Sequence, residues 1–124
     1  MLKEIKILLV DDQPDFIETI SFWMKTKGYQ VVTASDGIEA LEKVAREKPA
    51  VVLLDVYMPR KSGLEVLREI KQSHSDVAVI MVTAVTDEVV GQTALTMGAL
   101  DYIVKPFDLD YLERVLWWKL KLMG

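Results

Sequence analysis

The sequence predicts an α/β fold in which one doubly wound parallel sheet carries helices on both faces. Short apolar runs alternate along the chain with segments whose apolar residues recur at helical spacing, and this alternation is typical of βαβ units with a parallel sheet. The 124 residues suffice for a core, and no low-complexity stretch divides them, so we expect one domain over residues 1–124.

The predicted strands share a short length and a high content of valine, isoleucine and leucine. Strands covered by helices on both faces have this composition, because neither face meets water. The runs lie at residues 5–10, 29–34, 50–54, 77–82 and 101–104.

The first two helices are bounded by proline and glycine. Pro14 suits the first turn of a helix, and Gly28 suits the position after its last turn. The second helix follows the turn at 35–37 and ends before Pro49, because the residue before a proline avoids the helical conformation.

The last three helices begin at residues suited to a helix start. Gly63 leads into the third helix, and Asp87 caps a fourth helix that ends before Gly98. Asp108 caps a last helix over about 109–122.

This last helix carries more apolar surface than one buried stripe requires. Its inward face is predicted at Leu112, Val115 and Leu116, with the stem of Lys119. Other apolar side chains extend further around the helix: Tyr111, Trp117, Trp118, Leu120 and Leu122. Exposed apolar patches mark contact sites, so the helix either docks a partner or leads into further chain.

Composition excludes several classes of protein. No apolar run approaches the roughly 20 residues that span a bilayer, and residues 1–4 carry no cleavable apolar segment. Cysteine is absent, which excludes disulfides and thiolate metal sites. The net charge of −4 argues against direct contact with nucleic acid. We expect a cytoplasmic protein that binds neither membrane nor nucleic acid directly.

Four of the predicted strands are followed by a group that can bind a metal ion or a phosphoryl group. Asp11 and Asp12 follow the first strand, Asp55 the third, Thr83 the fourth and Lys105 the fifth. The carboxyl ends of parallel strands meet at one edge, where open α/β sheets bind ligands. We therefore expect the five side chains to converge.

Three carboxylates in one pocket require a cation, because like charges raise one another's pKa. Mg²⁺ prefers oxygen ligands, whereas a chain with no cysteine and one histidine is poorly suited to zinc. A carboxylate beside Mg²⁺ can attack phosphorus and form an aspartyl phosphate. Lys105 would neutralise charge on the phosphoryl oxygens, and Thr83 would donate a hydrogen bond to them.

Five blocks in this order extend the pattern over nearly the whole chain, and together they resemble the receiver domain of two-component response regulators. The blocks are Leu9-Val10-Asp11-Asp12, Leu54-Asp55 with Met58-Pro59 and Gly63, Val82-Thr83-Ala84, Gly98-Ala99 with Asp101-Tyr102, and Lys105-Pro106-Phe107.

The resemblance implies a flavodoxin-like sheet of strand order 2-1-3-4-5 and a phosphoryl acceptor at Asp55. The donor would be the phosphohistidine of a sensor histidine kinase or phosphotransfer protein. Asp12 and Asp55 would bind Mg²⁺ through their side chains, Tyr57 through its backbone carbonyl, and Asp11 through a metal-bound water.

The resemblance also implies a switch. Thr83 and Lys105 would contact the phosphoryl oxygens, and Tyr102 would turn inward as Thr83 moves. The face made by the fourth helix, fifth strand and fifth helix would then change, for homodimerisation or partner binding. Such a domain catalyses its own phosphorylation and dephosphorylation and is not a turnover enzyme.

Two positions depart from the family pattern. Tyr57 is bulky, and Val85 is apolar where family members often carry a polar group. Because nothing here orients the attacking water, we expect slow self-dephosphorylation. An ordinary packing role for Tyr102 is equally compatible with the sequence.

Two alternatives stay open. A phosphohydrolase with an aspartyl nucleophile commonly has a second acid two residues later, where this chain has Tyr57. A binding module independent of phosphorylation would keep the fold but has no need of the complete set of acids, threonine and lysine. The sequence leaves open both a stand-alone receiver and a piece of a larger regulator.

Overall fold

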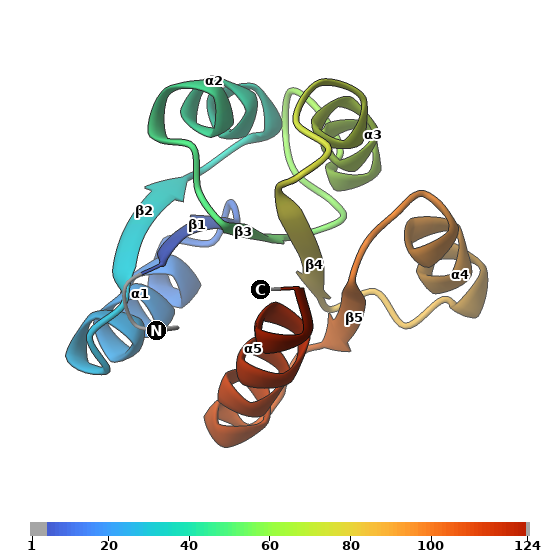
Figure 1. The fold of residues 1–124 in the computed structure, drawn as a ribbon. Helices are drawn as coiled ribbons and strands as arrows, with labels where there is room; N and C mark the ends of the chain where they lie inside the picture. Colours follow the sequence, from blue (N-terminus) through green and yellow to red (C-terminus); the bar gives the residue numbers. More distant parts are fainter. Residues whose placement is uncertain (1–4, 124) are drawn as a thin grey trace.

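The computed structural model describes the backbone of residues 5–123 and the side chains of residues 5–120. Over this range five strands alternate with five helices (Figure 1). The elements are β1 (Lys6–Val10), α1 (Pro14–Thr26), β2 (Gln30–Ala34), α2 (Gly37–Glu47), β3 (Val51–Leu54), α3 (Gly63–Ser73), β4 (Ala78–Thr83), α4 (Glu88–Thr96), β5 (Asp101–Val104) and α5 (Leu109–Met123).

The five strands form one parallel sheet of order β2-β1-β3-β4-β5. β1 lies between β2 and β3, so that Leu8 pairs with Val32 on one side and with Val52 on the other. The predicted α/β fold and strand order are confirmed.

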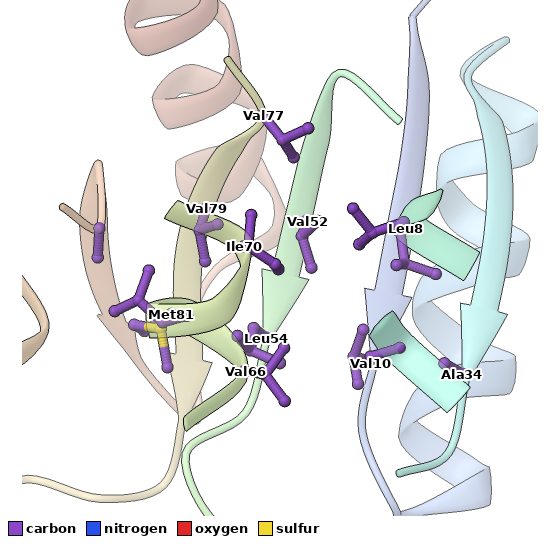
Figure 2. Packing of buried hydrophobic residues seen from close by; sticks show 14 of the residues in the cluster. Leu8, Val10, Ala34, Val52, Leu54, Val66, Ile70, Val77, Val79 and Met81 are labelled. Atoms are coloured by element: carbon purple, nitrogen blue, oxygen red, sulfur yellow. The ribbon is translucent and has the colours of Figure 1, made fainter. Parts of the chain in front are cut away.

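Helices cover both faces of the sheet: α1 and α5 lie on one face, and α2, α3 and α4 on the other (Figure 1). Each strand sends alternate side chains to the two faces. Leu8 and Val10 of β1 belong to the buried cluster that includes Val66 and Ile70 of α3 (Figure 2). The opposite cluster combines further strand residues with α1 and α5, including Ile7, Leu9, Ile20, Met24, Leu112 and Leu116.

The helices begin and end where capping chemistry allows. Pro14 is the first residue of α1, and Gly28 follows that helix with φ at 96°. Asp36, Ser62 and Asp87 each accept a hydrogen bond from a backbone N–H of the helix that follows. The cap predicted at Asp87 is confirmed, and the caps at Asp36 and Ser62 are additions.

Four strands begin one residue later than the sequence predicts, and β1 is one of them, beginning at Lys6. β3 begins at Val51, one residue late, and β2 begins after Tyr29, which is nevertheless buried. β4 is shifted by one residue and includes Thr83, because Thr83 pairs in register with Val104 of β5.

The prediction for α5 was right for its inward face and wrong for one outward residue. Leu112, Val115 and Leu116 are buried, and Leu120 is buried as well because it lies one turn beyond Leu116 on the same stripe. The other predicted outward side chains with described positions are exposed: Tyr111, Trp117 and Trp118.

Two sequence predictions concern residues outside the described part of the chain. They are the apolar surface predicted at Leu122 and the absence of a cleavable apolar segment predicted for residues 1–4. Among the described residues, none of the helices has the length and apolar content needed to cross a membrane.

Candidate functional site

Three acids lie together at the carboxyl ends of β1 and β3. One carboxylate oxygen from each of Asp11, Asp12 and Asp55 lies within 4.8 Å of the others, and we call these residues the acidic cluster. β1 and β3 are hydrogen-bonded neighbours, which explains why residues so distant in sequence meet. Asp11 is 1% exposed and Asp55 is 8% exposed, whereas Asp12 faces solvent. The pocket is therefore open on the side of Asp12.

Lys105 reaches the acidic cluster from β5. Its Nζ lies 2.6 Å from an oxygen of Asp11 and 3.9 Å from an oxygen of Asp55. The backbone N–H of Lys105 donates to the carbonyl of Thr83, which fastens the end of β5 to β4, and the Lys105–Pro106 peptide is cis. One ammonium group thus faces two carboxylates, and in this state it pairs mainly with Asp11.

The environment of Asp55 disfavours its ionised form. Burial raises the pKa of this carboxyl above its ordinary value, and the negative charge on Asp11 raises the pKa further. A hydrogen bond from the Thr83 side chain, the charge of Lys105 and the backbone N–H of Val56 oppose that rise. An additional cation in the pocket would favour the carboxylate.

The loop after Asp55 is closed by a tight contact with Gly63. The N–H of Gly63 donates to the carbonyl of Val56 over 2.6 Å. A Cβ atom at Gly63 would lie 1.9 Å from the carbonyl oxygen of Asp55, so only glycine fits there. Tyr57 lies in this loop with its side chain 66% exposed.

Thr83 is linked to Tyr102 through the loop after β4. Val85 donates its N–H to the Thr83 hydroxyl at 3.3 Å, and its carbonyl accepts from the Tyr102 hydroxyl at 2.8 Å. The Tyr102 ring lies beside Gly91 of α4. The Thr83 hydroxyl is therefore connected through Val85 to Tyr102 of β5, whose ring borders α4.

The structure adds two residues that sequence reasoning did not assign to the site. The Lys105 ammonium lies 4.0 Å from the centroid of the Phe16 ring, and Phe16 packs edge-to-face against Phe107. Phe107 stands in one of the matched blocks, but Phe16 carries no sequence signal of its own. An aromatic residue on the apolar stripe of a helix is the ordinary pattern of a core.

The family model of the response regulator receiver domain matches residues 7–116. This chain belongs to that family. Members of the family interact with histidine kinases or phosphotransfer proteins, and the acidic pocket of this receiver domain is consistent with phosphorylation.

Curated relatives are longer proteins. The chain is 40% identical over 103 residues to the alkaline phosphatase synthesis transcriptional regulatory protein PhoP of Bacillus subtilis (strain 168), covering 83% of this chain and 43% of the relative. It is 42% identical over 111 residues to the response regulator MprA of Mycobacterium leprae (strain TN), and the match covers 87% of this chain and 47% of that relative. The chain thus spans about half the length of the curated relatives it matches.

Solved structures share the fold over nearly the whole chain. The signal receiver domain of the putative Luxo repressor protein from Vibrio parahaemolyticus has a TM-score of 0.91 at 28% identity, covering 97% of this chain and 92% of that one. The CheX-CheY-BeF3-Mg²⁺ complex from Borrelia burgdorferi has a TM-score of 0.89 at 28% identity, and the match covers 94% of this chain and 89% of that chain.

Proposed function

We propose that this chain is a phosphorylation-activated receiver in which Asp55 accepts a phosphoryl group from the phosphohistidine of a sensor histidine kinase or phosphotransfer protein. The observation that carries the proposal is the acidic cluster, in which one oxygen of each carboxylate lies within 4.8 Å of the others and Lys105 lies within 3.9 Å of two of the three acids, Asp11 and Asp55. We assign the whole of residues 1–124 to this domain and place it in the cytoplasm, in contact with other proteins rather than with membrane or nucleic acid.

The donor set fits Mg²⁺. The acidic cluster supplies only oxygen ligands, and its side at Asp12 is open to water, which suits an ion that keeps several waters. Asp12, Asp55 and the carbonyl of Tyr57 would hold the ion, with Asp11 acting through a bound water. When bound, Mg²⁺ supplies positive charge that offsets the phosphoryl oxygens and the acids. The similarity to a receiver solved with BeF3 and Mg²⁺ supports this assignment.

The transfer step uses Asp55 as the nucleophile. A carboxylate oxygen of Asp55 attacks phosphorus, an O–P bond forms, and the P–N bond of phosphohistidine breaks. The histidine nitrogen leaves with the electron pair of that bond and takes up a proton. Thr83 donates its hydroxyl to a phosphoryl oxygen, and Lys105 shifts from Asp11 toward the phosphoryl group, near its present 3.9 Å contact with Asp55. Later attack by water on phosphorus returns Asp55 and releases phosphate.

The switch follows from the links of Thr83. Tyr102 already lies partly buried against the core, with its hydroxyl bonded to the Val85 carbonyl. When the Thr83 hydroxyl turns to the phosphoryl group, the contact from Val85 weakens, and the loop at Val85 shifts together with the Tyr102 ring. The face of α4, β5 and α5 then changes. This face exposes Val89, Val104, Tyr111 and Trp118, an apolar set suited to a second copy or a protein partner.

Intact-mass measurement after treatment with acetyl phosphate tests the assignment. We expect the wild type to gain the mass of one phosphoryl group in the presence of Mg²⁺, and to gain none in EDTA. Asp55→Asn should gain none under either condition. The same samples run on size exclusion would show whether activation drives dimerisation. An unmodified wild type, or equal modification of Asp55→Asn, would contradict the proposal.

A further inference from the structure

We propose that Phe16 is a positioning residue for Lys105, with the face of its ring holding the ammonium group beside the acidic cluster. The inference rests on the proposed function, because it assigns Phe16 a part in phosphoryl transfer to Asp55. Phe16 itself touches no reacting atom.

Three groups surround the Lys105 ammonium. An oxygen of Asp11 lies at 2.6 Å, an oxygen of Asp55 at 3.9 Å and the centroid of the Phe16 ring at 4.0 Å. Only 13% of the Lys105 side chain is exposed, so water competes weakly for this cation. A cation within about 6 Å of a ring centroid is attracted by the negative face of the ring. Phe16 therefore contributes to the position of the charge.

The ring is itself held in place. Phe16 packs at a centroid distance of 6.3 Å and an interplanar angle of 74° against Phe107, two residues after Lys105. It belongs to α1, which starts at Pro14 next to the acidic cluster, where Asp11 accepts a hydrogen bond from the Gln13 N–H. Helix α1, which follows Asp11 and Asp12, thus also carries the Phe16 ring that faces Lys105.

A ring face differs from a carboxylate in one respect that matters for transfer. It attracts the ammonium without accepting a conventional hydrogen bond, so the three N–H donors of Lys105 stay available for oxygen atoms. When the ammonium leaves Asp11 for a phosphoryl oxygen, the ring can hold it throughout. A leucine of similar bulk would fill the space but would lack this attraction.

The test compares rate constants of phosphorylation by acetyl phosphate with Mg²⁺. For Phe16→Leu we expect a decrease of about 3- to 30-fold, the range that a partly desolvated cation–π contact implies. Phe16→Tyr and Phe16→Trp keep a ring face and should stay within about threefold of the wild type. Phe22→Leu is the matched control, since Phe22 is 70% exposed on the same helix and should leave the rate unchanged.

A double-mutant cycle separates positioning from packing. If Phe16 acts through Lys105, Phe16→Leu should lower the rate much less in a Lys105→Met background than in the wild type. An equal decrease in both backgrounds, or a wild-type rate for Phe16→Leu, would overturn the inference. The proposed function fails separately, through absence of phosphorylation in the wild type itself.

NMR of the metal-free protein gives a readout that needs no phosphorylation. The ε-methylene protons of Lys105 should be shifted upfield by the Phe16 ring current in the wild type and in Phe16→Tyr, but not in Phe16→Leu. Unshifted ε-protons in the wild type would show that the contact is absent in solution and would refute the inference.

Discussion

The hydroxyl of Tyr102 donates a 2.8 Å hydrogen bond to the backbone carbonyl of Val85. This bond joins β5 to the loop between β4 and α4, across 17 residues of sequence. The same loop residue donates its N–H to the Thr83 hydroxyl. The loop therefore stands between the hydroxyl proposed to contact the phosphoryl group and the side chain proposed to respond.

Replacement of Tyr102 by phenylalanine should loosen that loop. The variant removes one hydrogen bond in a partly buried setting, so we expect the free energy of unfolding in urea to fall by about 1 kcal/mol. Amide exchange over residues 84–87 should become faster. Tyr111→Phe is the matched control, because Tyr111 is 40% exposed, and it should change neither quantity.

Asp55→Asn should stabilise the metal-free protein at neutral pH. Burial and the neighbouring charge of Asp11 hold the pKa of Asp55 above its ordinary value of 3.8. The folded state thus binds this proton more tightly than the unfolded state, and the associated stability is complete below the unfolded pKa and is lost as pH rises through the folded pKa. The asparagine variant avoids that loss.

Urea unfolding in EDTA from pH 3.8 to 7 would test the direction of this stability difference between Asp55→Asn and the wild type. The advantage of Asp55→Asn over the wild type should be largest at pH 7 and should shrink toward the acid end. An advantage that is constant with pH, or a loss of stability at pH 7, would contradict the assigned environment of the carboxyl.

Magnesium should stabilise the wild type through the acidic cluster. At ten times its dissociation constant, an ion that binds only the folded state adds about 1.4 kcal/mol to the free energy of unfolding. Asp12→Asn should lose most of this gain. Asp15→Asn should keep it, because Asp15 lies in the first turn of α1 outside the acidic cluster. Thermal unfolding with and without the ion decides between the variants.

Gly63→Ala should disrupt the loop that carries the phosphorylation site. The added Cβ would meet the Asp55 carbonyl at 1.9 Å, so we expect a loss of about 3 kcal/mol or more in unfolding free energy.

Gly91→Ala makes a matched comparison on the same chain. Its Cβ would lie 3.8 Å from the Tyr102 ring, an ordinary contact within a helix. This variant should gain up to about 1 kcal/mol. Equal effects of the two substitutions would show that the loop is less tightly packed than the geometry indicates.

The phosphorylated protein should lose its phosphoryl group slowly. Val85 has no polar side-chain group to orient water, and the bulky Tyr57 ring would cover the acyl phosphate bond, so introducing a base or a smaller polar residue should speed hydrolysis. Val85→Glu and Tyr57→Asn should each shorten the lifetime, the former by about tenfold or more. Val89→Glu serves as the control on an exposed valine of α4. If neither Val85→Glu nor Tyr57→Asn shortens the lifetime, the prediction is wrong.

Local pattern was sufficient for the sheet and for the convergence of the acidic cluster. Apolar runs followed by Asp11, Asp55 and Lys105 predict side chains at one edge, because a parallel sheet brings all its carboxyl ends together. The register was harder to predict. Thr83 belongs to β4 because it pairs with Val104 of β5. This pairing depends on the tertiary fold and cannot be read from the residues around Thr83.

The sequence did not predict the contacts between apolar side chains and the charged site residues. Phe16 lies 89 residues from Lys105 in the chain, counted from their residue numbers, and its helical spacing indicates ordinary core packing. The preference of Lys105 for Asp11 over Asp55 depends on distances of 2.6 and 3.9 Å. Leu120, in contrast, could have been placed correctly, since it continues the spacing of Leu112 and Leu116.

Because the strands are parallel, the proposed site residues gather at the carboxyl edge of the sheet, and the amino edge carries none of them. The turn between α3 and β4, at residues 74–77, lies at the amino edge of the sheet, opposite the acidic cluster. Ser75 and Asp76 are exposed there. A peptide tag inserted at this exposed turn should therefore leave phosphoryl transfer intact, because the insertion lies far from the acidic cluster.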